Sequence, residues 1–96
     1  MIFAEIEYEK KYPEMHDELV DFFEDGFPAI QHGHQGDSWI WIFENEEKVA
    51  IDTFSSMKHQ IKASSAEYSL INKVIEYAKT KYAVVIYKTP ELEAHE

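Results

Sequence analysis

The fold class is decided by residues 39–54, WIWIFENEEKVAIDTF. Within Trp39–Phe43 the aromatic residues occupy every second position, and isoleucines fill the positions between them. This period of two is typical of a β-strand, in which successive side chains point to opposite faces. A turn around Asn45 separates this strand from a second predicted strand, Lys48–Phe54. Two consecutive strands joined by so short a turn favour an antiparallel sheet.

The chain that follows adds a strand, a helix and a last strand. Alternating residues predict a strand over Met57–Ala63. Residues 64–67, SSAE, have the capping-box spacing, which predicts that a helix begins there and runs to about Lys81. Residues 83–87 are almost continuously apolar, which predicts a strand at a central position in the sheet.

The chain that precedes the pair adds a strand and a helix. Residues 2–9 alternate between apolar and mostly acidic positions, which predicts a strand. The residues expected to face the helices are Ile2, Ala4, Ile6 and Tyr8, and those expected to face away are Phe3, Glu5, Glu7 and Glu9. Pro13–Asp25 carries apolar residues at helical spacing, and Gly26 is suited to end that helix. Residues 29–38 contain two glycines and are expected to form a loop.

The resulting element order is β-α-β-β-β-α-β. It predicts an α+β two-layer sandwich, in which a mainly antiparallel sheet of four to five strands carries two helices on one face, of the ferredoxin-like or split β-α-β type. We expect residues 1–90 to form one domain and residues 91–96 to be a frayed acidic tail. No apolar run reaches membrane-span length and no signal peptide pattern precedes the domain, so a cytoplasmic location is expected.

The charge of the chain is strongly negative and unevenly distributed. The formal net charge is −10, and all nine basic residues are lysines. Without arginine the chain lacks the planar group that grips phosphates, and an acidic chain repels nucleic acid, so direct nucleic-acid binding is not expected. Residues 1–25 hold nine acids and two lysines, whereas residues 53–89 hold two acids and six lysines.

The predicted helix Pro13–Asp25 carries a face made of carboxylates. Six acidic residues fall at i, i+3, i+4, i+7, i+10 and i+11, opposite the apolar positions, and no lysine interrupts them. We name this set the acidic stripe; its members are Glu14, Asp17, Glu18, Asp21, Glu24 and Asp25. The candidate partner-binding surface is this stripe together with Glu5, Glu7 and Glu9. The alternative is a face that only makes the protein soluble.

Trp39, Trp41 and Phe43 share one face of their predicted strand. They belong either to the core or to an exposed aromatic patch that anchors an interface. We expect them in the core, because large aromatic side chains are mostly buried. Lys58, Gln60 and Lys62 are expected on the outer face of the sheet, near the acidic residues of the first strand.

His32 and His34 are two residues apart, so an extended chain would place both imidazoles on one side, as a metal site requires. A third ligand would have to come from Asp37, His59 or a residue elsewhere in the chain. A polar loop is the simpler interpretation, and neither a metal nor a cofactor is expected. Residues 55–58, SSMK, match the S-x-x-K motif by letters but lie between two strands, so no catalytic residue is assigned.

These observations favour a binding protein that is not an enzyme. The expected function is a small acidic protein-binding module, of inhibitor or immunity type, that docks its acidic helix on a basic, nucleic-acid-handling partner. The first alternative is a homo-oligomeric structural or regulatory domain that pairs through its open sheet face or an edge strand. The second alternative is a small metal-dependent enzyme that uses His32, His34 and His59.

Overall fold

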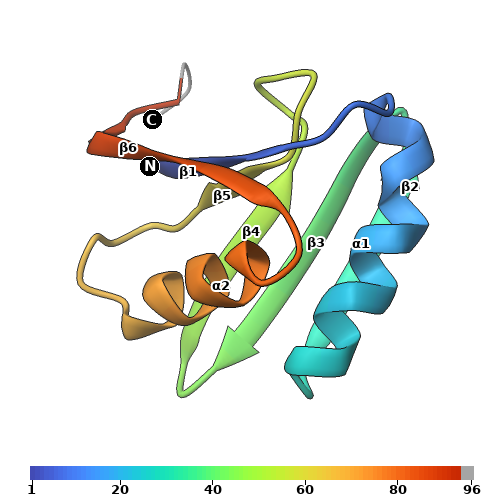
Figure 1. The fold of residues 1–96 in the computed structure, drawn as a ribbon. Coiled ribbons are helices and arrows are strands. Elements are labelled where there is room, and N and C mark those ends of the chain that lie inside the picture. Colours follow the sequence, from blue (N-terminus) through green and yellow to red (C-terminus); the bar gives the residue numbers. More distant parts are fainter. Residues whose placement is uncertain (94–96) are drawn as a thin grey trace.

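The computed structural model describes residues 1–93, which form six strands and two helices (Figure 1). Their bounds are β1 Ile2–Glu7, α1 Tyr12–Gly26, β2 Ile30–Gln35, β3 Asp37–Glu44, β4 Glu47–Asp52, β5 Gln60–Lys62, α2 Ser69–Lys79 and β6 Ala83–Glu91. No helix in this part of the chain is long and apolar enough to cross a membrane.

The six strands form one open sheet in the order β2-β3-β4-β5-β1-β6, and every neighbouring pair is antiparallel. The predicted α+β class with a mainly antiparallel sheet and two helices is therefore confirmed. The predicted count of four to five strands is wrong, and the sandwich and ferredoxin-like details are not confirmed. In the β3–β4 hairpin Asn45 and Glu46 both have positive φ, as the tight turn expected there requires.

The additional strand is β2, which lies in the segment expected to be a loop. It pairs along its whole length with β3, from Ile30 opposite Ile42 to Gln35 opposite Asp37. Gly36 has a φ of 80° and makes the tight reversal between the two strands. Histidine, glutamine and glycine have weak strand propensity, but pairing with the strongly strand-forming β3 outweighs it.

Two further predictions about the sheet are corrected. β6 is an edge strand and not a central one, and the side chains of Val85 and Ile86 are about half exposed. An apolar run alone does not distinguish an edge strand from a central one, and here β1 occupies the place between β5 and β6. β5 is limited to Gln60–Lys62, because the chain from residue 53 to residue 59 forms a connecting loop.

Helix α1 extends one residue beyond each end of the predicted helix Pro13–Asp25, with Pro13 in its first turn and Gly26 as its last residue. Helix α2 begins at Ser69, later than the capping-box residues predict. The side chain of its N-cap residue, Tyr68, makes no capping hydrogen bond. Instead the Glu47 carboxylate on β4 accepts a hydrogen bond from the Leu70 amide at 2.9 Å. A carboxylate distant in sequence thus satisfies an amide of the first helical turn, which no local motif could predict.

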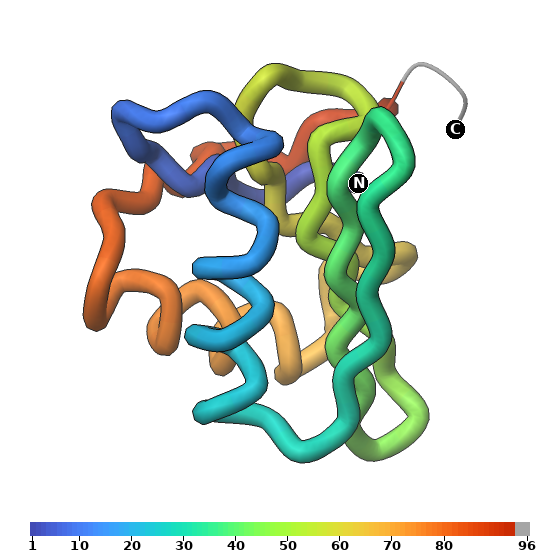
Figure 2. The backbone as a smooth tube through the Cα atoms, turned by 90° about the vertical axis from the view of Figure 1, so that its right-hand side faces the viewer, coloured from blue at the N-terminus to red at the C-terminus, as the bar shows by residue number. Residues whose placement is uncertain are grey.

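Both helices lie on the same side of the sheet, and the other side is left open (Figure 2). The apolar residues of both helices belong to one buried core cluster with those of the sheet. α1 packs on β2 and β3, whereas α2 packs on β4, β5, β1 and β6. Ile40 and Ile42 are completely buried in this core, so Trp39 and Trp41 lie on the open face and are only partly buried. The expectation that the tryptophans belong to the core is therefore wrong.

β1 departs from a simple alternation at its start. Ala4 and Ile6 are completely buried, as expected, but Phe3 is also buried in the core cluster instead of facing outward. The reason is a β-bulge between Ile2 and Ala4, where the pairing of β1 with β5 and β6 shifts its register. The bulge interrupts the alternation of side chains between the two faces.

Candidate functional site

The acidic stripe lies on the surface of α1 opposite the helix face that packs on β2 and β3. The members with an exposed side chain are Glu14, Asp17, Asp21, Glu24 and Asp25. The buried positions Met15, Leu19 and Phe23 alternate with them along the helix and hold the stripe outward. Five of the six predicted stripe residues are therefore available to a partner.

Glu18 is the member of the stripe that the protein itself uses. The Tyr82 hydroxyl donates a hydrogen bond of 2.6 Å to its carboxylate, and the Lys10 ammonium lies 3.4 Å away. The hydrogen bond from Tyr82 is the main reason why the pKa of Glu18 is lowered. Within residues 1–93 no lysine forms an ion pair with the other five carboxylates, so their charge is not neutralised internally.

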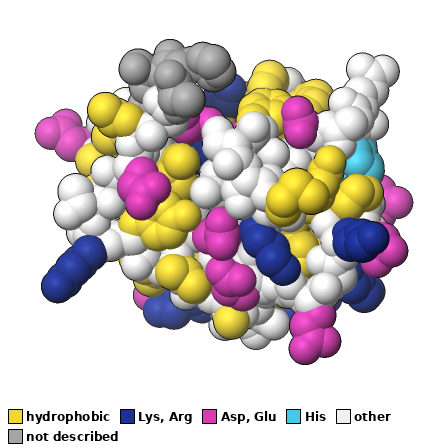
Figure 3. Space-filling model, turned by 90° about the horizontal axis from the view of Figure 1, so that it is seen from above, with side chains coloured by type: hydrophobic (Ala, Val, Ile, Leu, Met, Phe, Trp, Pro, Cys, Tyr) yellow, Lys and Arg dark blue, Asp and Glu magenta, His cyan; other side chains and the backbone are white. Residues whose placement is uncertain are grey.

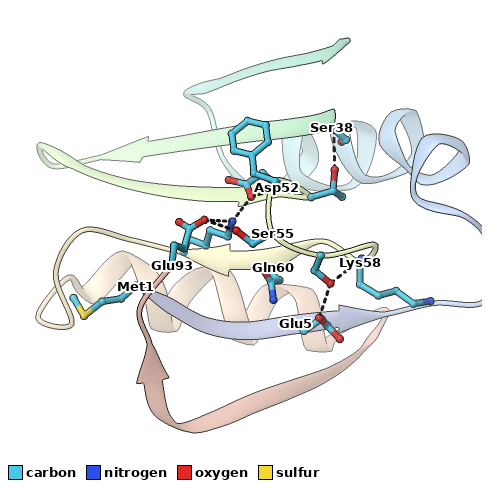
Figure 4. A network of polar contacts seen from close by, with 12 residues as sticks. Met1, Glu5, Ser38, Asp52, Ser55, Lys58, Gln60 and Glu93 are labelled. Carbon is cyan, nitrogen blue, oxygen red and sulfur yellow. Dashed lines mark hydrogen bonds and ion pairs between the residues drawn. The ribbon is translucent and has the colours of Figure 1, made fainter. Parts of the chain in front are cut away.

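The structure separates Glu5 and Glu7 from the stripe. Both side chains point to the open face of the sheet, because the alternate residues Ala4 and Ile6 point into the core. The Ser56 hydroxyl donates a hydrogen bond of 3.1 Å to Glu5, as Figure 4 shows. Glu9 is exposed in the connection to α1. The predicted surface of nine carboxylates is therefore divided between two faces of the molecule.

A chain of buried polar side chains crosses the core beneath α1. Its members are Tyr8, His59, Ser38 and His16, and we call it the histidine relay. The Tyr8 hydroxyl lies 2.7 Å from His59 Nδ1, and His59 Nε2 lies 2.7 Å from the Ser38 hydroxyl. The same hydroxyl lies 2.6 Å from His16 Nδ1. Ser38, His59 and His16 are almost completely buried, so α1, β3 and the residue before β5 meet through hydrogen bonds within the core.

Hydrogen bonds of the main chain hold the two middle members of the relay, Ser38 and His59, in place. The Ser38 amide donates to the Thr53 hydroxyl, and the Thr53 amide donates to the Ser38 carbonyl, both at 3.1 Å. The Ile6 amide donates to the His59 carbonyl at 2.8 Å, which joins the residue before β5 to β1. Ser38 is therefore positioned by two strands. Its hydroxyl is also shielded, so a substrate cannot reach it in this structure.

His32 and His34 lie beside the outer end of the relay. Their ring centroids are 5.5 and 4.9 Å from that of His16, and both side chains are exposed. The third imidazole near this pair is thus His16, and not the His59 that the sequence suggested. Sequence reasoning missed His16, although it is next to Met15 and three residues before Leu19 on the buried side of α1. Among residues 1–93 no group of three or more histidine or acidic side chains is arranged to hold a metal ion.

Burial sets the protonation of the relay. It lowers the pKa of His59 to about 3, and the nearby His16 and His34 add to this effect. Burial also lowers the pKa of His16, with His34 and His32 adding to the effect and Asp17 opposing it. The pKa of Tyr8 is raised to about 12, chiefly by burial. Near neutral pH the two relay histidines are therefore neutral and Tyr8 keeps its proton.

The open sheet face carries a second polar cluster, centred on a buried lysine. The Lys62 ammonium lies 2.6 Å from Asp52 and 2.7 Å from Glu93, and Figure 4 shows these carboxylates converging on it. The Ser55 hydroxyl also donates to Glu93 at 2.8 Å. Burial raises the pKa of Asp52 although Lys62 acts in the opposite direction. Lys62 therefore lies on the outer face as expected, but its partners are Asp52 and Glu93 and not the acids of β1.

Next to this cluster the two tryptophans cover β2. The Trp39 and Trp41 ring centroids are 4.4 Å apart, and the Lys48 ammonium lies 3.8 Å above the Trp41 ring. The Trp39 ring lies directly over Gly33, so a residue with a side chain at position 33 would overlap the ring. The open face therefore presents a partly buried aromatic pair instead of a continuous apolar surface.

No protein-family model, no curated protein and no solved structure matches the chain.

Proposed function

We propose that the protein is a small cytoplasmic protein-binding module, of inhibitor or immunity type, that docks the acidic stripe of α1 on the basic surface of a nucleic-acid-handling protein. The observation that carries this proposal is that five exposed carboxylates follow one helix face without an internal counter-ion. The lysines that do form ion pairs serve other acids, such as Glu44 and Asp52.

Energetic considerations support a functional reason for the stripe. Like charges at i, i+3 and i+4 destabilise a helix by about 0.2–0.5 kcal/mol per pair. Glu24 and Asp25 add to this cost, because they lie at the negative end of the helix dipole. A basic partner would offset the repulsion and be attracted from a distance, which gives fast association that weakens with salt.

Charge reversal on the stripe tests the proposal. The stripe variant Asp17→Lys, Asp21→Lys, Glu24→Lys changes three exposed side chains and should fold normally. The control variant Glu46→Lys, Glu67→Lys, Glu91→Lys changes three exposed carboxylates elsewhere. Both raise the formal net charge from −10 to −4, so they differ only in where the charge is altered.

The assay is a pull-down at 50 mM and 500 mM NaCl, followed by competition with duplex DNA for each protein recovered. We expect a basic partner that the wild type and the control variant retain at low salt, that the stripe variant loses, and that DNA displaces. A partner retained equally by the stripe variant would contradict the proposal, as would retention that does not depend on salt.

A second candidate function is self-association through β6, favoured by its position at the sheet edge. Val85 and Ile86 are 49% and 53% exposed there, and an unprotected edge strand pairs readily with another strand. Figure 3 looks onto the side of the molecule that carries β6 and shows hydrophobic side chains in several patches among charged ones. Light scattering from 10 to 200 µM should then show a dimer for the wild type and for a Leu92→Lys control, and a monomer for Val85→Lys. A wild type that is monomeric throughout would contradict this candidate.

A further inference from the structure

The hydrogen bonds of the histidine relay can run in two directions. The two directions differ in whether Tyr8 and His16 donate or accept a proton. In the first direction, the Tyr8 hydroxyl donates to His59 Nδ1, His59 Nε2–H donates to Ser38, and the Ser38 hydroxyl donates to His16 Nδ1. The Tyr8 oxygen also accepts from the His59 amide at 3.2 Å. Every proton between Tyr8 and His16 then has an acceptor inside the relay, so this direction is favoured when both histidines are neutral.

The opposite direction is the one that a protonated His16 requires. His16 then carries a proton on Nδ1 and donates it to Ser38, so the Ser38 hydroxyl must turn to His59 Nε2. His59 must in turn carry its proton on Nδ1 and donate it to Tyr8. The Tyr8 oxygen accepts this bond, and its own proton points to solvent, which the half-buried side chain allows. No buried group is left without a partner.

We propose that the histidine relay is a pH-sensitive switch that takes up a single proton, which charges His16 and reverses the hydrogen bonds as far as Tyr8. The protons balance along the chain. One proton from solvent is added to the Tyr8 oxygen, and the original proton of Tyr8 passes to His59 Nδ1. The Nε2 proton of His59 passes to Ser38, and the former Ser38 proton passes to His16 Nδ1. His59 remains neutral and only changes tautomer.

The relay does not accept a second proton while the protein is folded. If both histidines were charged, Ser38 would receive two N–H donors and its own proton would have no acceptor. Two positive charges would then lie on either side of one buried hydroxyl. The side-chain partners of Ser38 include no acidic group that could compensate these charges. The charge is placed on His16 and not on His59, because burial affects His59 more strongly.

Charged groups at both ends bear on the switch. At the His16 end, Asp17 on α1 favours the charge, whereas His32 and His34 on β2 oppose it. At the Tyr8 end, the Lys58 ammonium lies 4.5 Å above the ring and also donates to the Tyr8 carbonyl. The charges of Glu5 and Glu7 on β1 add to the rise in the pKa of Tyr8. Burial of His16, with His34 and His32 adding to it, places the uptake below the ordinary histidine pKa of about 6.5.

The consequence lies in the attachment of α1 to the sheet, because His16 is the helix side chain that hydrogen-bonds to β3 across the core. A charged His16 would also lie beside the rings of His32 and His34 on β2, on which α1 packs. The inference goes beyond the proposed docking function and does not depend on it. If the stripe does bind a partner, the same helix would respond to pH.

Nitrogen-resolved NMR of the histidine rings between pH 7.5 and 4.5 tests the switch on the isolated protein, because ring nitrogen shifts report charge and tautomer separately. We expect His16 and His59 both to carry their proton on Nε2 at pH 7.5. As His16 becomes doubly protonated, His59 should convert to the Nδ1–H tautomer with the same midpoint and stay neutral. A His59 tautomer that does not change while His16 titrates would overturn the proposal, as would protonation of His59 before His16.

Two variants separate the relay from a simple titration of His16. In Ser38→Ala the connection is cut, so His16 should titrate while the His59 tautomer stays constant. In Tyr8→Phe the reversed state leaves the Nδ1–H of His59 without an acceptor, so the midpoint of His16 should shift to lower pH. Tyr8 is only half buried, which keeps this second test available if Ser38→Ala does not fold. An unchanged midpoint in Tyr8→Phe would also contradict the proposal.

Discussion

Gly33 determines where the indole of Trp39 can lie. A Cβ atom at residue 33 would overlap the Trp39 ring, and the two residues are directly opposite in the β2–β3 pair. Lys62 has a comparable effect on the same sheet face, since its ammonium forms ion pairs with two carboxylates, those of Asp52 and Glu93. Single residues on the open face therefore decide how the tryptophans and the buried charges are arranged.

We predict that Gly33→Ala destabilises the protein by about 1–3 kcal/mol, the usual range for an overpacked site. The cause is displacement of Trp39, so the tryptophan fluorescence spectrum should change at the same time. Urea unfolding measures the cost. In a Trp39→Leu background the same substitution should cost clearly less, and an equal cost in both backgrounds would contradict this explanation.

A second residue-scale prediction concerns Lys62 and Asp52, whose side chains are both 4% exposed. Lys62→Met should destabilise the fold by about 3–5 kcal/mol, because it leaves Asp52 buried without its cation. The double variant Lys62→Met, Asp52→Leu should regain most of this loss, since replacing a whole buried ion pair by apolar residues is often neutral. Urea unfolding of the wild type, the two single variants and the double variant gives the coupling free energy between Lys62 and Asp52. A double variant no more stable than Lys62→Met would contradict this explanation.

At the scale of elements, α1 is attached to the sheet by an apolar face and by one hydrogen-bonded histidine. Its apolar residues Met15, Leu19 and Phe23 are nearly or completely buried, and His16 lies among them. The outer face of the helix carries the stripe and contributes little to the packing. Helix α1 therefore combines a surface suited to a partner with a buried group whose charge depends on pH.

Stability should fall as the solution is acidified below the ordinary histidine pKa of about 6.5. The pKa of His59 is lowered to about 3 in the fold, so the unfolded chain binds more protons between these two values. This contribution to stability is complete above pH 6.5 and is lost progressively toward pH 3. For His59 alone the loss between pH 7.5 and pH 5 is about 2 kcal/mol, at about 1.4 kcal/mol per pH unit for one proton.

Urea unfolding at the two pH values measures this loss. His59→Gln should be less stable than the wild type at pH 7.5 but should lose less on acidification, because glutamine does not titrate. His16→Gln provides the comparison for the other relay histidine, whose pKa is also lowered by burial. If His59→Gln and the wild type lose the same stability between the two pH values, His59 is not the cause.

At the scale of the whole molecule, the acidic residues are concentrated in the N-terminal part of the sequence, but the fold distributes them over both sides of the sheet. The stripe lies on the helical side, whereas Glu5, Glu7 and the Lys62 cluster lie on the open face. Opposite charges meet in a few ion pairs, and the net charge of −10 remains largely unscreened within the fold. Repulsion between carboxylates therefore opposes the compact state.

We expect the melting temperature to rise when NaCl is increased from 20 to 500 mM, because salt screens this repulsion. The stripe variant Asp17→Lys, Asp21→Lys, Glu24→Lys should melt higher than the wild type at low salt and show a smaller rise. Calorimetry at both salt concentrations measures the difference. A stripe variant with the same salt response as the wild type would show that repulsion along α1 does not limit stability.

Local periodicity in the sequence was enough to predict most of the helices and strands. Apolar spacing defined α1 and the inward face of α2, alternation defined β1 and β3, and Asn45 marked the hairpin turn. These features depend on residues close in the chain, whose periodicity is visible in one sequence. The exposed stripe of α1 followed from the same periodicity, because a helix that buries one face exposes the opposite one.

Features that depend on residues distant in the chain were visible only once the chain was folded. β2 became a strand through pairing with β3, and β6 became an edge strand because β1 lies between it and β5. Ile40 and Ile42 face the helices, which places Trp39 and Trp41 on the open side, although the alternation alone allows either choice. The histidine relay joins residues 8, 16, 38 and 59, which meet only after α1 has packed on the sheet. Pairing partners, the choice of face and buried polar contacts are set by which surfaces pack together, and local periodicity carries no information about that.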